Sequence, residues 1–267
     1  MYIEINKRRY YSRGGDLKPV SSGRDEDLKL IPIAEQTAIN QKRMTVIGHP
    51  FFFYKGGPMP ERQDFKNRVR QELIKAAGQY KQIYVDYEYL VCAKSFVKKE
   101  YYIIAAERDN FQHLTGVHAN MDANSFFEKC YNGTLSEEDF DFIKKGQNEK
   151  AVKGTVRRKI KALPYMMKLF TPGVEVEESF RKNSVICSFA TADGNCTLGS
   201  SKSGKARPKS LIKGNELQNH NTVDLILRRT SGSLLFNEII VGDSSSLNQF
   251  KEKIQKIVSP EVFEKSV

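Results

Sequence analysis

The stretch that decides the fold is Tyr101–Val117, which reads YYIIAAERDNFQHLTGV. Its first part, Tyr101–Ala106, is aromatic, β-branched or small and predicts a strand. The segment Phe111–Val117 follows, and Phe126–Tyr131 then predicts a helix. The chain therefore changes secondary structure where it presents His113 beside a hydroxyl and a glycine. Such a junction holds exposed side chains on a rigid base and favours chemistry.

Upstream of this stretch the pattern predicts a helix and a hairpin. Residues 64–80 place apolar side chains at spacings of three and four, which is typical of an amphipathic helix. The apolar run Ile83–Val91 is separated from Tyr101–Ala106 by a polar segment, which predicts two paired strands. Downstream, Ser136 followed by three acidic residues predicts the start of a second short helix after Tyr131.

A longer helix is predicted from about Thr155, and it carries the first cluster of basic residues. Pro164 should kink it, because proline removes the bond to the Ile160 carbonyl. Lys159 falls at the border between an apolar and a basic face, so its amine can reach inward past the edge of the core. The apolar face is formed by Val156, Ile160, Leu163, Met167 and Phe170, and the basic face by Arg157, Arg158, Lys161, Tyr165 and Lys168.

The second half of the chain predicts strands. After an acidic break at 175–178, strands are expected at 184–191, 196–200, 222–229 and 234–241. A second basic cluster, Lys202 to Lys213, contains Gly204, Pro208 and Gly214, which predict a loop. The tail from Ser244 to Val258 has helical spacing and should pack on the domain.

Helices and strands are segregated along the chain rather than alternating, which indicates an α+β fold. We expect N-terminal helices packed on an antiparallel β-sheet. Three parts are predicted: an N-terminal extension of unknown role (1–60), the main domain (61–241) and a C-terminal amphipathic helix (242–267).

Composition limits the functional classes. The formal net charge of +11 favours a polyanionic partner. Four scattered cysteines without a Cys-x-x-Cys pair predict reduced, buried thiols and no metal site. Glycine-rich nucleotide motifs are missing, so no cofactor is expected. No apolar run of membrane-spanning length and no leader-like N-terminus occurs, so a cytoplasmic protein without membrane contact is expected.

One histidine, two hydroxyls and two basic clusters are the groups that metal-independent RNA cleavage needs. In that reaction the 2′-hydroxyl attacks the phosphate, so one group must take its proton and another must protonate the leaving oxygen. Histidine can do either. Lysine and arginine can stabilise the phosphorane, with arginine adding bidentate geometry.

The segments Phe111–Val117 and Phe126–Gly133 resemble the signature of a phage-associated nuclease family, the fourth phage subtype of the barnase/EndoU/colicin/RelE-like (BECR) fold. Thr155–Ile160 and Pro208–Leu211 match the order of later elements, and the resemblance covers about Phe65 to Val241. It implies a metal-independent RNase, encoded by phages or mobile elements, that acts as a toxin or effector.

The resemblance also implies site residues. His113 and Thr115 match the motif, Arg158 or Lys159 matches the basic position on the central helix, and Ser210 matches the late hydroxyl. Our hypothesis makes His113 the general base or acid, Arg158 and Lys159 the stabilisers of the transition state, and Thr115 and Ser210 the groups that orient phosphate oxygens. Thr115 could instead be a turn or cap hydroxyl, and Ser210 a plain loop residue. The expected nucleic-acid contacts are Arg157, Lys161, Lys202, Lys205, Arg207, Lys209, Arg228 and Arg229.

The expected substrate is tRNA or mRNA in a bacterial host cell, and an inhibitor or host protein is a possible partner. Two alternatives stay open at this stage. The chain could be a catalytically inactive module that binds nucleic acid, or a module that binds a protein target in phage–host conflict. An ADP-ribosyl-type transferase is a weaker third, because no downstream glutamate on a strand matches its catalytic residue.

Overall fold

The structure is a computed structural model that describes residues 2–5, 8–13, 16–19, 64–201 and 205–264. The chain divides into two units, Met1–Glu61 and Arg62–Val267. In the first unit three strands pair antiparallel in the order β1-β2-β3, and the remainder of the predicted extension lies outside the described residues. These strands are β1 (Tyr2–Ile5), β2 (Arg8–Arg13) and β3 (Asp16–Pro19).

A four-stranded antiparallel sheet forms the middle of the second unit, in the order β16-β15-β4-β5. The predicted hairpin is confirmed, with Glu88 opposite Ala105 and Leu90 opposite Ile103. The strands are β4 (Tyr87–Cys92), β5 (Tyr102–Ala105), β15 (Leu225–Thr230) and β16 (Glu238–Val241).

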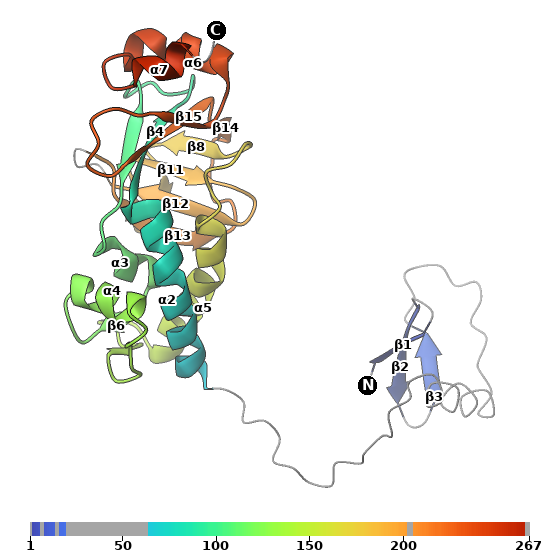
Figure 1. Ribbon diagram of the computed structural model, residues 1–267. Helices are drawn as coiled ribbons and strands as arrows, with labels where there is room; N and C mark the ends of the chain where they lie inside the picture. The colour runs from blue at the N-terminus through green and yellow to red at the C-terminus, as the bar shows by residue number, and fades with distance from the viewer. Residues whose placement is uncertain (1, 6–7, 14–15, 20–63, 202–204, 265–267) are drawn as a thin grey trace, which may run out of the picture. The chain divides into compact units, whose positions relative to one another are not determined.

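Both faces of this sheet are covered. Tyr89 and Val91 face the main core, whereas Leu90 and Cys92 face a second core built with the C-terminal helices. Because both faces of β4 are covered, its buried side chains are apolar on both faces apart from Glu88, which explains why this run is not alternating. The predicted C-terminal helix is in fact two helices, which lie at the opposite end of the unit from α3 and α4 (Figure 1). They are α6 (Ser244–Ile254) and α7 (Pro260–Glu264).

A five-stranded antiparallel sheet has the order β13-β12-β11-β8-β14. Ala206, just before its edge strand β13, joins it to the first sheet. The Ala105 amide donates to the Ala206 carbonyl at 3.0 Å, and the Ala206 amide donates to the Ile103 carbonyl at 2.7 Å. The start of β13 therefore lies beside the end of β5. The strands are β8 (Glu175–Glu178), β11 (Phe189–Ala192), β12 (Cys196–Ser200), β13 (Pro208–Lys213) and β14 (Asn221–Thr222).

Two short pairs complete the strands of this unit, β6 (His118–Ala119) with β7 (Phe140–Asp141) and β9 (Arg181–Lys182) with β10 (Val185–Ile186).

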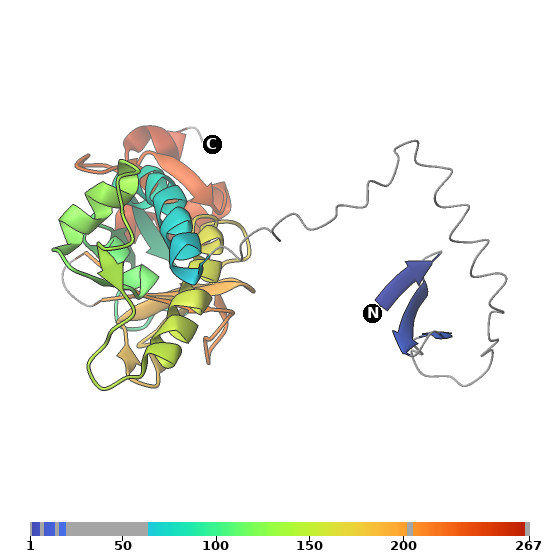
Figure 2. The same cartoon turned by 90° about the horizontal axis from the view of Figure 1, so that it is seen from below.

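The helices pack together through aromatic side chains. Helix α2 packs against α4 and against α5, and α5 packs on β12 and β13 (Figure 2). The Tyr80 and Phe111 ring centroids are 5.2 Å apart, and the Phe111 and Phe127 centroids are 5.6 Å apart. The helices are α2 (Phe65–Tyr80), α3 (Asn110–Thr115), α4 (Ala123–Tyr131) and α5 (Glu149–Met166). These helices and the antiparallel sheets confirm the α+β class.

Three expectations about helices need correction. Residues 83–85 were expected in a strand, but they belong to a π-helical turn, η1 (Lys81–Val85). That turn stacks the Tyr84 ring on Tyr80 at 5.6 Å and lets the Tyr84 hydroxyl donate to the Met166 carbonyl at 2.6 Å. No helix begins at Ser136, because the Asp139 carboxylate accepts its amide in a turn. Helix α5 begins before Thr155, at Glu149, because Asn148 caps it.

Two expectations about strands were also wrong. The acidic break at 175–178 is strand β8, because partners satisfy its carboxylates. Glu177 accepts the Gln218 amide at 2.8 Å, and Glu175 contacts His220 at 2.8 Å. The predicted basic loop is a strand from Pro208 onward, because the register with β12 satisfies its backbone. The four cysteines are buried free thiols, as expected.

Candidate active site

His113 lies on the short helix α3, with its side chain exposed. The helix is fixed from its other face, because Phe111 and Leu114 are fully buried in the main core. Its end is defined by Gly116, whose φ is +78° and whose amide donates to the Gln112 carbonyl at 3.2 Å. Glycine adopts this left-handed conformation without the steric cost that other residues incur. The motif therefore presents an exposed imidazole on an anchored helix.

Lys159 of α5 connects the two helices at this point. Its Nζ donates to the main-chain carbonyl of His113 at 2.7 Å. That carbonyl is in the last turn of α3, where carbonyls lack partners within the helix and a cation is favourable. A Cβ at Gly116 would lie 2.8 Å from Lys159 Cδ, so the glycine leaves room for the lysine chain. Lys159 thus lies inward of the basic face of α5, as expected from the sequence.

The charge on Lys159 is easier to remove than that of an ordinary lysine. Burial lowers its pKa to about 8, and the positive charge of Lys144 adds to the effect. The side chain is therefore mostly protonated at pH 7, but it can exchange its proton within the range in which enzymes work. One hydrogen bond thus joins a lysine of lowered pKa on α5 to the main chain of His113 on α3.

Thr115 does not extend toward a ligand. Its side chain is fully buried, and its hydroxyl donates to the Gln112 carbonyl at 2.7 Å within α3. The structure therefore contradicts a direct contact with phosphate and favours the turn-hydroxyl interpretation. The physical reason is that α3 includes this residue, which turns its side chain into the core.

Ser210 is mostly buried on β13. It pairs with Gly199, and a Cβ on that glycine would lie 3.7 Å from Ser210 Cβ and 2.6 Å from Cys187 Sγ. Ser210 therefore points to the side of the sheet where Cys187 lies. Within residues 64–201 and 205–264, no hydrogen bond joins Ser210 to His113 or Lys159.

The other basic residues expected on α5 are exposed. Arg158 donates to Thr155 Oγ1 at 3.2 Å and makes no ion pair within the described part of the chain. Arg157 lies over the Phe65 ring, 5.0 Å from its centroid. It shares with Lys161 a groove of about 580 Å³ between α2 and α5. These cations are open to solvent and to an anionic ligand.

Several cations expected to bind nucleic acid are instead paired with carboxylates. Arg229 is buried and forms two hydrogen bonds with Glu88 Oε2, at 2.6 and 2.8 Å. Lys205 binds the other oxygen of Glu88 at 2.6 Å. Arg229 cannot contact a nucleic acid in this arrangement, because burial and Glu88 remove its charge from the surface. This correction could not come from local sequence, since Glu88 and Arg229 are 141 positions apart.

Two further expected contacts are partly neutralised. Arg228 binds Glu238 at 2.7 Å, and its guanidinium lies 4.2 Å from the Tyr87 ring centroid. Arg207 forms an ion pair with Glu107, which lies three residues before α3. Lys209 is exposed on β13, and Lys202 lies outside the described residues.

In the part of the chain that the structure describes, no group of three His, Cys, Asp or Glu side chains could hold a metal ion. No helix among the described residues is long and apolar enough to cross a membrane.

The fold and the site define an α+β protein in which a helix-borne histidine and a lysine meet beside a sheet edge. Comparison with protein families then identifies the class more closely. The family described as phage-Barnase-EndoU-ColicinE5/D-RelE like nuclease 4 matches residues 72–233, which is more than half of the chain. The chain therefore belongs to this phage-associated nuclease family. No curated protein and no solved structure gives a significant match.

The matched range contains α3, α5, β13 and β15, and thus every described residue of the candidate site. Sequence reasoning missed the contact between Gly116 and Lys159, because it depends on how α3 packs on α5. It also missed Glu88 and Glu107 as counterions. Gly116, three residues after the motif histidine, was the available signal, since a positive φ is a common reason for glycine at the end of a helix.

Proposed function

We propose that this protein is a metal-independent endoribonuclease that cleaves RNA by attack of the 2′-hydroxyl on the adjacent phosphate. Membership in a nuclease family supports the reaction class. The observation that carries the mechanism is the hydrogen bond from Lys159 Nζ to the His113 carbonyl. It fixes a cation beside the residue whose imidazole can move a proton.

In this mechanism the exposed imidazole of His113 takes the proton of the 2′-hydroxyl or protonates the leaving 5′-oxygen. The ammonium of Lys159 stabilises the negative charge that develops on the phosphorane, since two of its three N–H donors are free of the His113 carbonyl. Its lowered pKa also suits it to transfer a proton. Arg158, exposed on the same helix, supplies a second cation. Thr115 and Ser210 are left out of this mechanism because their side chains are buried.

A role as an effector or toxin is part of this proposal and rests on membership in a phage-associated family; the proposed substrate is tRNA or mRNA. Total bacterial RNA incubated with the protein in EDTA tests the proposal directly, because EDTA removes the metal ions that a two-metal nuclease requires. We expect fragments that end in a cyclic phosphate. His113→Ala should lower the rate by about 10²–10⁴-fold, the usual contribution of a general acid or base.

As a control, thermal unfolding tests whether the His113→Ala variant is still folded. The His113 side chain is exposed, so its removal should leave the thermal midpoint close to that of the wild type. RNA that binds but stays intact with the wild-type protein would favour the inactive binding module instead. Full activity of His113→Ala would remove His113 from the mechanism.

A further inference from the structure

A second cationic surface is formed by residues other than those of the candidate active site. A groove of about 490 Å³ is bordered by Lys98 and Lys99, Arg181 and Lys209. These residues come from the β4–β5 loop, β9 and β13, and all four side chains are exposed. Segments that are distant in sequence thus bring four positive charges to one hollow.

These charges are not cancelled by carboxylates. No aspartate or glutamate borders the groove, and within the described residues none of the four cations forms an ion pair. Lys98 donates to the Ser179 hydroxyl, and Lys99 lies 5.3 Å from the centroid of the Tyr102 ring. Lys205 and Arg207, by contrast, both form ion pairs with glutamates, so the four groove cations differ from them in having no counterion among the described residues.

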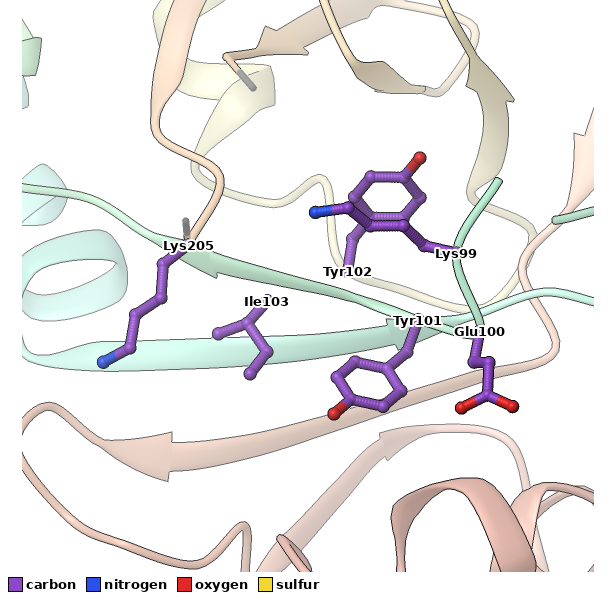
Figure 3. A pocket seen from close by; sticks show the side chains of 6 residues that line it. All are labelled: Lys99, Glu100, Tyr101, Tyr102, Ile103 and Lys205. Atoms are coloured by element: carbon purple, nitrogen blue, oxygen red, sulfur yellow. The ribbon is translucent and has the colours of Figure 1, made fainter. Parts of the chain in front are cut away.

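The nearest acids, Glu100 and Glu178, form no ion pair with the four cations within the described residues, although Glu178 accepts the backbone amide of Lys98. Figure 3 shows Lys99 and Tyr102 on one side of the chain and Glu100 and Tyr101 on the other; all four line an adjoining cavity of about 450 Å³, which thus shares Lys99 and Tyr102 with the groove. Glu178 accepts the Tyr102 hydroxyl at 2.6 Å and the Val97 amide at 2.8 Å. Glu100 and Glu178 keep their negative charges, but neither lines the groove, and the four cations outnumber them, so the groove keeps a net positive potential.

The lining also indicates what kind of anion fits. Its one aromatic ring, that of Tyr102, is buried, so neither a base nor a protein anchor can stack on it. The rest of the lining is three serines with Ile186 and Cys187, and the Ser188 hydroxyl donates to the Ser201 carbonyl at 2.7 Å. Flexible cations and hydroxyls without aromatic anchors suit a chain of phosphates read without sequence preference.

Strand β13 connects this groove to the candidate active site. Helix α3 packs against β13, and Arg207 is paired with Glu107 just before that helix. Arg207 and Lys209 are two residues apart along extended chain, so their Cα atoms are about 7 Å apart. A ligand strand that passes α3 can continue along residues 207–209 into the groove.

We propose that this groove binds the phosphodiester backbone of the RNA strand beyond the scissile phosphate. The inference rests on the proposed ribonuclease function, which it extends by a substrate-binding site. The site takes the negatively charged backbone of single-stranded RNA and does not read bases. It makes the same contacts in the ground state and the transition state, so it should act on KM rather than on kcat.

The test uses a labelled single-stranded RNA of mixed sequence and the full chain with His113→Ala, so that the RNA stays intact. In that background, Arg181→Gln with Lys209→Gln removes two cations that have no hydrogen-bond partner among the described residues. The slope of log Kd against log salt should fall by about 0.7 per lost phosphate contact, or about 1.4 in total, and Kd should rise about tenfold near 0.1 M salt.

The matched control is Lys75→Gln with Lys256→Gln, which removes the same charge from exposed positions on α2 and after α6. It should leave the salt slope unchanged. Arg181→Lys with Lys209→Arg keeps the charge and should bind like the parent. If the groove variant and the control bind RNA equally, the groove inference is wrong.

Cleavage of total RNA by the wild-type chain, and by the groove variant with His113 restored, separates the ribonuclease proposal from the groove inference. If this chain cleaves RNA but the groove variant keeps the KM of the wild type, the groove inference alone fails. If the chain does not cleave RNA but the groove variant loses binding, the ribonuclease proposal fails and the backbone-binding site stands.

Discussion

Gly116→Ala tests the joint between α3 and α5. The substitution places a Cβ on a residue with φ of +78°, which costs about 1–2 kcal/mol in the left-handed region. The same Cβ would lie 2.8 Å from Lys159 Cδ, so the lysine chain must move. Its hydrogen bond to the His113 carbonyl is worth about 1 kcal/mol at this half-buried position. We therefore expect a total loss of about 2–3 kcal/mol.

Gly133→Ala is the matched control. Gly133 has φ of +73° at the end of α4, but a Cβ there would meet nothing within 4 Å. It should lose the backbone contribution of about 1–2 kcal/mol and nothing more. Urea unfolding of both variants measures the difference, which we expect to be about 1 kcal/mol. Gly116→Ala should also lower RNA cleavage, whereas Gly133→Ala should not.

A double-mutant cycle with Lys159→Ala tests whether contact with the lysine chain causes the extra destabilisation of Gly116→Ala. Without the lysine chain, Gly116→Ala should cost no more than Gly133→Ala, because the only contact closer than 3.4 Å at that position is gone. The reasoning is refuted if Gly116→Ala and Gly133→Ala are equally stable with Lys159 in place. It is also refuted if the extra cost of Gly116→Ala persists after Lys159 is removed.

Three further predictions concern pH and the supporting structure. Between about pH 8 and 10.5 the unfolded chain keeps the Lys159 proton that the folded chain loses, so the unfolding free energy of the wild type relative to Lys159→Met should increase with pH, and cleavage should decline above about pH 8. Urea unfolding and cleavage rates measured as a function of pH test the two expectations. A free-energy difference that does not change with pH would contradict the burial of Lys159. Glu88→Gln should lower the unfolding free energy by about 3–5 kcal/mol, because it leaves the buried Arg229 guanidinium unpaired, and a change under 1 kcal/mol would show that the pair contributes little. Phe250→Ala should cost about 3–5 kcal/mol by emptying the second core, as measured by thermal unfolding, whereas unchanged stability would mean that α6 is dispensable.

Local sequence was sufficient to predict the elements whose apolar pattern corresponds directly to the faces they bury. The spacing of Val156, Leu163 and Met167 gave the buried face of α5, and the position of Lys159 between its two faces was correct. The β4–β5 hairpin followed from its apolar runs. The family signature around His113 pointed to a nuclease, and the family comparison agrees.

Tertiary structure decided what depends on partners distant along the chain. The acidic residues 175–178 can form a strand because distant segments satisfy their carboxylates: residues 215–220 bind Glu175 and Glu177, and residues 97–102 bind Glu178. From the sequence Arg229 was expected to be a surface cation, but pairing of β15 with β4 places it against Glu88. Thr115 was expected to contact the substrate, but its position on α3 directs its side chain into the core.

The sequence by itself thus determined the α+β class, the main helices and the nuclease family. Only the folded chain decided which cations remain free and which are neutralised, and it alone brought Lys159 to the His113 carbonyl. The physical reason is that periodicity records which face of an element is buried, whereas charge pairing and burial depend on distances between segments that the sequence separates.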